Sequence, residues 1–347
     1  MTDASETPTV TGLPSGLSPR TPGLEDHEPV VALLAAHQRS VRGSSSVDPA
    51  AVASALTGTA SWTRRQVVLD DAAGRVVAWA SLHDRAAGRT VVDVTLVPDL
   101  PSGDATAAAL FAWAETAALE ITRLRELDGT QLDASAYADD ERQRTWLGKA
   151  GYRHTRTWLQ MSRPVPPEEG DPGALPGPRE GVTVRRVAKH DDGLPVAQDL
   201  QTVHRMLEES FADHFNSYRE SFPEFLQRLR EDPGHRWDHW WIAEIDVDGE
   251  QVPGGALVST VLPPDDSGIE GSYVDYIGVH RRSRGRGVAK ALLHTVIADA
   301  AQRGRNRVGL EVDADSPTGA DGLYVSMGWE TKYRTESWHR DVTVGDA

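Results

Sequence analysis

Val279-His280-Arg281-Arg282-Ser283-Arg284-Gly285-Arg286-Gly287-Val288-Ala289 is the stretch of sequence that decides the fold of the second half of the chain. The residues before it, 273–279, predict a strand, and apolar residues recur at helical spacing over 288–303. A strand that turns directly into a helix directs unpaired backbone N–H groups and the positive end of the helix dipole at one point. Glycines let an anion approach the backbone, and Arg284 and Arg286 add positive charge, so the stretch predicts a phosphate-binding turn.

Two common phosphate-binding patterns do not fit this turn. A dinucleotide fingerprint needs Gly-x-Gly-x-x-Gly, and Lys290 stands where the third glycine is required. A P-loop needs Gly-Lys-Ser or Gly-Lys-Thr, which does not follow here. The turn instead matches the pattern Arg-x-x-Gly-x-Ala, with Arg284, Gly287 and Ala289 at its specified positions.

A second motif follows further along the chain, after a strand predicted at 308–312. It reads Ser316-Pro317-Thr318-Gly319-Ala320-Asp321-Gly322-Leu323-Tyr324-Val325-Ser326-Met327-Gly328-Trp329 and predicts a short helix over 319–327. With both motifs in this order, the chain resembles the GCN5-related N-acetyltransferase (GNAT) family. The second motif looks like the family's Asn-x-x-x-Ala-x-x-Leu-Tyr-x-x-x-Gly-Phe segment, although Ser316 replaces the usual Asn and Trp329 the usual Phe.

The resemblance implies that acetyl-coenzyme A is the acyl donor and lies in a split between the strands at 273–279 and 308–312. Members of the family bind the pantetheine arm like an added strand and the pyrophosphate at the turn. A backbone N–H near the end of the first strand would polarise the thioester carbonyl. The residues expected to bind the donor are Ile277, Gly278, Val279, Arg284, Gly285, Arg286, Gly287, Val288 and Ala289.

The catalytic groups follow from the same resemblance. Tyr324 stands where the family places the tyrosine that protonates the departing thiolate; the alternative is a packed helix residue. The attacking amine must be neutral, so a nearby base would help. Asp275 is our first choice of base because it is a charged residue in an apolar strand, and the alternative is a position on the strand's polar face. Glu270, His280 and Glu311 are further candidates for the base.

The acceptor is expected beside an aromatic segment of the second half. The residues expected to contact it are Phe211, His214, Phe215 and Tyr218. Trp237, Trp240 and Trp241 follow, and Glu208, Glu209 and Asp213 could hold a cation. The alternative is that these aromatic side chains build the core and its cover.

The order of predicted elements occurs twice, which indicates a duplicated domain. The proline-rich residues 164–180 form the linker, because proline cannot continue a helix or a central strand. The expected organisation is a disordered tail (1–22), a degenerate GNAT-like domain (23–163), the linker (164–180) and a catalytic GNAT domain (181–347). The expected fold class is α/β (α+β), with two tandem GNAT-like domains, each a mixed, mostly antiparallel sheet flanked by helices.

The first half lacks the chemistry of the second. When Val97 is aligned with Val279, Ser102 falls at Arg284 and Ala105 at Gly287. Gly151-Tyr152 aligns with Gly328-Trp329, which puts Leu147 at Tyr324. We therefore expect one active site per chain. The tandem layout resembles that of the mycothiol synthases, two-domain members of the family with an active C-terminal domain, although no motif here indicates that substrate.

Composition limits the partners. The chain has 347 residues, a formal net charge of −16 and no cysteine, which excludes disulfides, thiolate metal sites and cysteine nucleophiles. An acidic chain is a poor ligand for nucleic acid, and no apolar run is long enough to span a membrane. No metal site is expected, because the 12 histidines show no His-x-x-x-His spacing. The N-terminus does not resemble a secretory signal, and a cytoplasmic protein is expected, with an oligomer left open.

Three functions remain open at this point. The first is an N-acetyltransferase that acts on the amine of a small molecule, and the second is one that acts on a protein or peptide amine. The third is a non-catalytic module that binds acyl-coenzyme A. Retention of both the Arg284–Ala289 turn and Tyr324 favours an enzyme.

Overall fold

A computed structural model of the chain describes residues 8–85, 89–211, 220–315 and 319–346. It divides into two compact units. Unit 1 comprises the described residues up to Leu159, Asp313–Asp315, and the residues from Tyr333 onward. Unit 2 comprises the described residues between Gln160 and Val312 and between Gly319 and Lys332.

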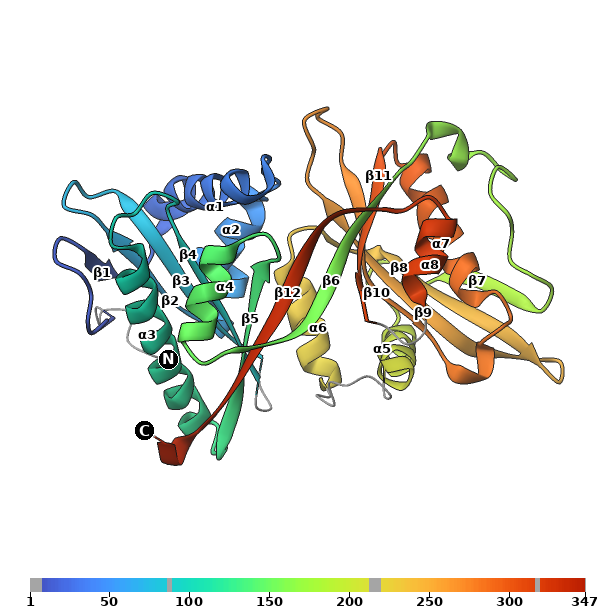
Figure 1. Cartoon of the computed structure of the whole chain (residues 1–347). Helices are drawn as coiled ribbons and strands as arrows, with labels where there is room; N and C mark the ends of the chain where they lie inside the picture. Colours follow the sequence, from blue (N-terminus) through green and yellow to red (C-terminus); the bar gives the residue numbers. More distant parts are fainter. Residues whose placement is uncertain (1–7, 86–88, 212–219, 316–318, 347) are drawn as a thin grey trace. The chain divides into compact units, whose positions relative to one another are not determined.

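Unit 1 is built on a mixed, mostly antiparallel sheet with the strand order β1-β2-β3-β4-β5-β12 (Figure 1). Its elements are β1 (Ser18–Arg20), η1 (Leu24–Asp26), α1 (His27–Arg42), α2 (Pro49–Leu56), η2 (Thr59–Thr63), β2 (Arg64–Asp70), β3 (Val76–Asp84), β4 (Arg89–Leu96), α3 (Gly103–Leu124), β5 (Gly129–Tyr137), α4 (Glu141–Lys149), the first part of β6 (Arg153–Pro164), β12 (Glu330–Thr343) and η5 (Val344–Asp346). Strands β4 and β5 are parallel, whereas β1–β2, β2–β3, β3–β4 and β5–β12 are antiparallel.

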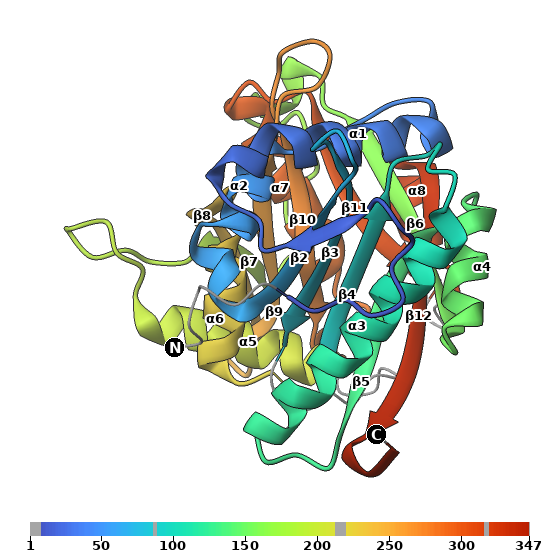
Figure 2. The same ribbon diagram turned by 90° about the vertical axis from the view of Figure 1, so that its left-hand side faces the viewer.

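Helices cover both faces of the unit 1 sheet (Figure 2). Alternate residues of β2, β3 and β4 pack with α3 in one core, where Leu82, Leu110 and Leu132 are fully buried. The intervening residues Val68 and Trp79 pack with α1 and α2 in a second, smaller core. This alternation is what the period of two of a strand requires when both faces are covered.

Unit 2 repeats this plan with the strand order β6-β11-β10-β9-β8-β7 (Figure 1). Its elements are the last part of β6, η3 (Pro167–Gly170), β7 (Val182–Arg186), α5 (Ala197–Phe211), α6 (Phe222–Glu231), β8 (His235–Val247), β9 (Glu250–Leu262), β10 (Gly271–Val279), η4 (Arg281–Ser283), α7 (Val288–Gln302), β11 (Arg307–Asp313) and α8 (Ala320–Ser326). Strands β10 and β11 are parallel, whereas β7–β8, β8–β9 and β9–β10 are antiparallel.

The unit 2 sheet also has helices on both faces. Trp240, Ala256 and Val258 pack against α5 and α6. On the other face a Cβ added to Gly255 would lie 2.9 Å from Val288 in α7. Burying a side chain of the size of Leu or Phe stabilises the fold by about 1.5–3 kcal/mol, so these two layers hold β8, β9 and β10 in place.

The expected fold class is confirmed, since each half is a mixed, mostly antiparallel sheet flanked by helices. One α-helix and one strand were not predicted. Helix α2 has only two apolar residues on its buried face, Val52 and Leu56, and β1 is three residues long. Such short segments carry too little periodicity to be recognised in a sequence.

The predicted boundaries differ from the observed units at both ends of the chain. Residues 8–22, expected to belong to a disordered tail, include β1, which pairs with β2, and Val10, which is buried in the unit 1 core. The last strand, expected in the second domain, pairs with β5 of unit 1 from Thr335↔Tyr137 to Thr343↔Gly129. Alternating residues predict a strand but not which sheet it joins, because either sheet edge can satisfy the same backbone.

The linker is an ordered part of unit 2. It begins with η3 and then follows α7, whose Gln302 and His294 side chains hydrogen-bond the carbonyl oxygens of Gly170 (3.2 Å) and Pro176 (3.0 Å). No helix in the described part of the chain combines the length and the apolar character needed to cross a bilayer. The same part holds no group of three or more His, Asp or Glu side chains placed to bind a metal ion.

Candidate active site

The centre of unit 2 is a fork between two parallel strands. Strand β10 pairs with β9 along its whole length, from Gly271↔Leu262 to Val279↔Gly255. Its pairing with β11 covers three positions and ends at Val274↔Leu310, although both strands continue. Within the described residues, the last part of β10 therefore has no ladder partner on the β11 side, and its backbone groups there are available to a ligand.

Two carboxyl groups stand where the strands part. Asp275 follows Val274 on β10, and Glu311 follows Leu310 on β11. Asp275 is also the extra residue of a β-bulge, because the register against β9 shifts between Val274 and Tyr276. A bulge places two residues of one strand opposite one residue of its partner and re-aims their side chains.

The surroundings of Asp275 favour its neutral form. Burial, followed by the charge of Asp232, raises the pKa of Asp275 to about 8, against the opposing effects of a Thr260 hydrogen bond and the charge of Arg228. Its Oδ2 atom is buried and has no hydrogen-bond partner among the described residues. A carboxyl group with a pKa near the working pH is suited to accept a proton and to return it.

Glu311 belongs to a small polar group on the same face of the sheet. Gln160 donates a hydrogen bond from Nε2 to Oε2 of Glu311 (2.9 Å), and the Tyr273 hydroxyl lies 3.5 Å from Oε1 of Gln160. Burial raises the pKa of Glu311, although the side chain is reached by solvent. The pairing register places Glu311 one residue beyond the last β10–β11 pair, at the start of the fork.

The turn after β10 has the geometry that its sequence predicts. Gly285 and Gly287 have φ angles of +79° and +85°, which side chains of other residues rarely adopt. Gly287 is the N-cap of α7, so the first N–H groups of that helix have no partner within the helix. The imidazole Nδ1 of His280 accepts the Arg282 N–H (3.2 Å), which ties the turn together, and Nε2 of the same ring lies 3.5 Å from Oε2 of Glu209.

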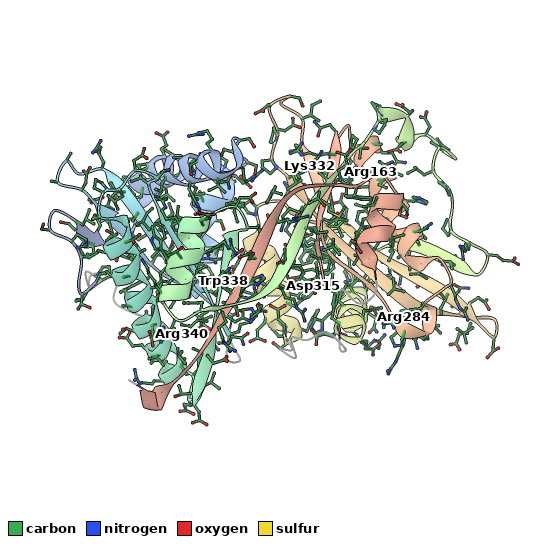
Figure 3. The ribbon with its side chains drawn as sticks, in the orientation of Figure 1. Arg163, Arg284, Asp315, Lys332, Trp338 and Arg340 are labelled. Atoms are coloured by element: carbon green, nitrogen blue, oxygen red, sulfur yellow. The ribbon has the colours of Figure 1, made fainter. Side chains whose placement is uncertain are left out.

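Arginine side chains surround this turn. Arg282 and Arg286 donate to the carbonyl oxygens of Pro253 and Asp246, both at 2.8 Å, and Arg284 lies exposed on the same loop (Figure 3). No ion pair joins these three arginines to a carboxylate in the described part of the chain. Their charge is therefore free to act on an anion at the start of α7.

Tyr324 lies in α8 with 7% of its surface exposed. Its ring meets Trp329 edge to face, with 5.9 Å between the ring centres. Burial raises the pKa of the Tyr324 hydroxyl to about 12, so the phenol stays protonated at neutral pH. Within the described residues the hydroxyl makes no hydrogen bond that would commit its proton.

The predicted acceptor residues are only partly visible. Phe211 packs at the edge of the α5–α6 core, whereas His214, Phe215 and Tyr218 lie outside the described residues. The tryptophans differ in burial. Trp237 is half-buried beside the core, and Trp240 is wholly buried in it. The alternative of a core residue is therefore correct for Trp240.

Sequence reasoning missed two residues that share a face with Asp275. Arg228 of α6 stacks on the Tyr276 ring (5.2 Å) and pairs with Glu220 (2.6 Å). His235 stands edge to face with Trp237, and burial lowers the pKa of His235 to about 4, which keeps it neutral. Nothing in their local sequence marks either residue, because only the packing of α6 and β8 brings them to the fork.

The geometry fits the donor that the sequence implied. A fork with unpaired backbone can hold an extended amide chain like an added strand. The left-handed glycines and the start of α7 can hold a diphosphate. At Gly285 an added Cβ would meet nothing within 4 Å, so the approach to the loop is open.

Comparison with known proteins agrees with this geometry. Residues 201–329 match the model of the acetyltransferase (GNAT) family. A rat protein (Rattus norvegicus) named N-acetyltransferase 8B is 36% identical over 95 residues, which is 27% of this chain and 40% of the rat protein. The chain thus spans less than half the length of this relative.

Similar folds are known among solved structures. A GCN5-related N-acetyltransferase from Sphaerobacter thermophilus has a TM-score of 0.73 and 23% identity, and the match covers 95% of this chain and 97% of that one. A tandem GNAT protein from the clavulanic acid biosynthesis pathway has a TM-score of 0.62 and 14% identity, with 95% and 99% covered. The likeness to mycothiol synthases in particular stays a prediction. The chain has the fold of a tandem GNAT protein, and its residues 201–329 match the acetyltransferase (GNAT) family model.

Proposed function

We propose that unit 2 transfers an acetyl group from acetyl-coenzyme A to the amine of a small molecule by direct attack. One observation carries the proposal: the parallel strands β10 and β11 part at Val274↔Leu310, with a carboxyl group on each side and a turn with two left-handed glycines between the end of β10 and the start of α7. The match of residues 201–329 to the GNAT family supports it.

The donor would be held by backbone and cations of this chain. Ile277 and Val279 offer unpaired backbone groups to the pantetheine amides, whereas the N–H and C=O groups of Gly278 point toward β9. The turn Arg284–Ala289 offers N–H groups and positive charge to the diphosphate. Bound acetyl-coenzyme A supplies an activated acetyl group. The residues of the chain then have to orient the thioester and handle two protons.

Asp275 is the proposed proton acceptor. Its unpartnered Oδ2 and its raised pKa suit it to take the proton that the amine loses on attack. Glu311 stands across the fork and is the alternative acceptor. Tyr324 is the proposed donor to the thiolate that leaves, because its phenol is protonated at neutral pH and its hydrogen is not committed.

The acceptor is proposed to be a small amine, since the polar groups at the fork are few and closely framed by aromatic rings. Phe225, Trp237 and Tyr276 lie on the same side of the sheet as Asp275. A partly apolar surface with only the carboxyl groups of Asp275 and Glu311 fits an amine that carries an apolar or ring-shaped body better than it fits a polycation.

Calorimetric titration of the whole chain with acetyl-coenzyme A tests the proposal first. We expect one site per chain. A panel of small amines, and a parallel panel of peptides with free N-termini or lysines, then identifies the acceptor through released thiol. Absence of binding would overturn the proposed function, and turnover of peptides alone would replace the small acceptor by a protein amine. Binding without thiol release from any amine would indicate a non-catalytic module.

The Tyr324→Phe variant tests the proton donor. We expect kcat to fall by about 10- to 100-fold at neutral pH while the Kd for coenzyme A is unchanged, because only the transition state needs the proton. Tyr137→Phe, at the end of β5 in unit 1, is the matched control and should keep native kcat. An unchanged rate for Tyr324→Phe across the pH range would assign Tyr324 a packing role.

A further inference from the structure

The linker between the two duplicated halves is fixed along α7, the helix that begins at the phosphate-binding turn. At the far end of α7, the Gln302 side chain donates to the Gly170 carbonyl, and a Cβ on Gly170 would lie 3.1 Å from the backbone nitrogen of Gln302. Midway, His294 bonds the Pro176 carbonyl (3.0 Å). Arg163 anchors the start of the linker through Glu169 (2.7 Å) and the Met327 carbonyl (2.7 Å). The linker therefore runs from the end of α7 to its beginning.

The last linker arginine, Arg179, reaches the turn itself. Its Nη1 atom donates a hydrogen bond to the Gly285 carbonyl oxygen at 3.2 Å. A Cβ on Gly287 would lie 2.9 Å from Cδ and 3.1 Å from Nε of Arg179. The guanidinium group thus rests on the two left-handed glycines that shape the start of α7.

The charge of Arg179 is not neutralised by a neighbour. In the described part of the chain, Arg179 has no carboxylate partner, and its one hydrogen bond uses one of the five N–H donors of a guanidinium group. Arg179 is exposed and is held by a backbone carbonyl oxygen, so the remaining N–H donors of its guanidinium group can reach a ligand.

We propose that Arg179 is a diphosphate-binding residue, so that the linker supplies part of the coenzyme A site. The inference rests on the proposed function and extends it to a residue outside the Arg284–Ala289 turn. The guanidinium fork matches two phosphate oxygens, and its contact with Gly285 places it beside the N–H groups at the start of α7. Through this contact, the end of the linker would form one wall of the diphosphate site.

Titration of the whole chain with coenzyme A and with dephospho-coenzyme A, which lacks the 3′-phosphate, tests this role. Arg179→Ala should raise the Kd for both by about tenfold, the effect of losing one exposed charge-assisted contact. Arg179→Lys keeps the charge without the fork and should raise the Kd by roughly threefold. Added salt should narrow the difference between native protein and the Arg179→Ala variant.

Arg236→Ala is the matched control. Arg236 is also exposed and donates to backbone carbonyl oxygens, those of Pro233 and His235. It lies at the start of β8, whereas the turn contacts Asp246 near the end of that strand. Arg236→Ala should leave both Kd values unchanged, and both variants should unfold at the native temperature.

The outcomes separate this inference from the proposed function. If the native chain binds coenzyme A and Arg179→Ala binds it equally well, the role of Arg179 is overturned while the function stands. A loss for coenzyme A but not for dephospho-coenzyme A would assign Arg179 to the 3′-phosphate and overturn the diphosphate assignment. A native chain that binds neither nucleotide would overturn both.

Discussion

In unit 1, β4 parts from β5 after Val92↔Ala134; in unit 2, β10 parts from β11 after Val274↔Leu310. The alignment of Val97 with Val279 makes these two positions equivalent, and it also makes Asp93 the counterpart of Asp275. Desolvation raises the pKa of both aspartates, although Asp93 is exposed in β4, and an arginine opposes the shift in each case. Both units thus contain the fork and its aspartate.

The two forks differ in what surrounds that aspartate. The β3–β4 register runs without a break past Ser81↔Asp93, whereas the β9–β10 register shifts at Asp275. Across the fork, Glu311 follows Leu310 in unit 2, but Ser135 follows Ala134 in unit 1. Unit 1 therefore has one carboxyl group where unit 2 has two, and no bulge to re-aim it.

The helices after the two forks begin differently. In unit 2, α7 begins directly after Gly287, and the backbone of Gly287 is in the left-handed conformation. In unit 1, the Gly103 N–H is taken by the Leu100 carbonyl (3.0 Å), and Asp104 stands in the first turn of α3. Asp104 is the counterpart of Arg286, so an acidic side chain already occupies the positive end of the helix dipole.

The comparison teaches that the fold and its chemistry are separable. The fork comes from strand pairing and is present in unit 1, whereas the proposed anion binding depends on a few residues at the helix start that unit 1 lacks. Leu147 in place of Tyr324 removes the proposed acid as well.

Replacing each of the two aspartates by asparagine is expected to give the largest difference in kcat/KM between the units. Asp275→Asn should lower kcat/KM by about 10²–10³-fold, because the amide cannot accept the proton of the amine. Asp93→Asn should leave kcat/KM unchanged. Steady-state kinetics on both variants and on Glu311→Gln decides the matter: a large loss in Glu311→Gln alone would make Glu311 the base, and a loss in Asp93→Asn would give unit 1 a part in the reaction.

The pH dependence of kcat/KM, which we attribute to Asp275 and not to Asp93, is the next largest expected effect. Because burial raises the pKa of Asp275 to about 8, its carboxyl group is mostly protonated at pH 7. We expect kcat/KM to rise by about tenfold per pH unit below that pKa and to level off above it. The rise should disappear in Asp275→Asn and persist in Asp93→Asn, which separates it from titration of the acceptor amine itself.

The same shift in the Asp275 pKa affects folding. A raised pKa in the folded state stabilises the protonated protein, and this contribution is lost as the pH rises from about 4 through about 8. The unfolding temperature of the native chain should therefore fall more between pH 6 and pH 9 than that of Asp275→Asn. Equal slopes would show that the carboxyl group titrates normally.

The smallest expected difference concerns the aligned pair Asp104 and Arg286. Arg286→Ala should raise the Kd for coenzyme A by roughly threefold, the effect of one exposed charge, without changing the unfolding temperature. Asp104→Ala should lower the unfolding temperature without changing the Kd for coenzyme A, because Asp104 accepts hydrogen bonds from Trp146 (2.7 Å) and Lys149 (3.1 Å) within unit 1. Calorimetry and thermal unfolding measure both. Weaker coenzyme A binding in Asp104→Ala would contradict the loss of anion binding in unit 1.

The sequence alone was sufficient for the features that are local in the chain. The turn Arg284–Ala289 could be predicted because its glycines, its charges and the start of α7 are neighbours in sequence, and the left-handed φ angles of Gly285 and Gly287 agree with it. The fold class could be predicted because the periods of strands and helices follow each other in the same order twice.

Only the tertiary structure decided which distant segments meet. It assigns the last strand to the unit 1 sheet, shifts the register at Asp275, sets Gln160 beside Glu311, and lays Arg179 on Gly285. The physical reason is that strand partners, bulges and side-chain contacts are set by the packing of many elements together, and no single segment specifies them.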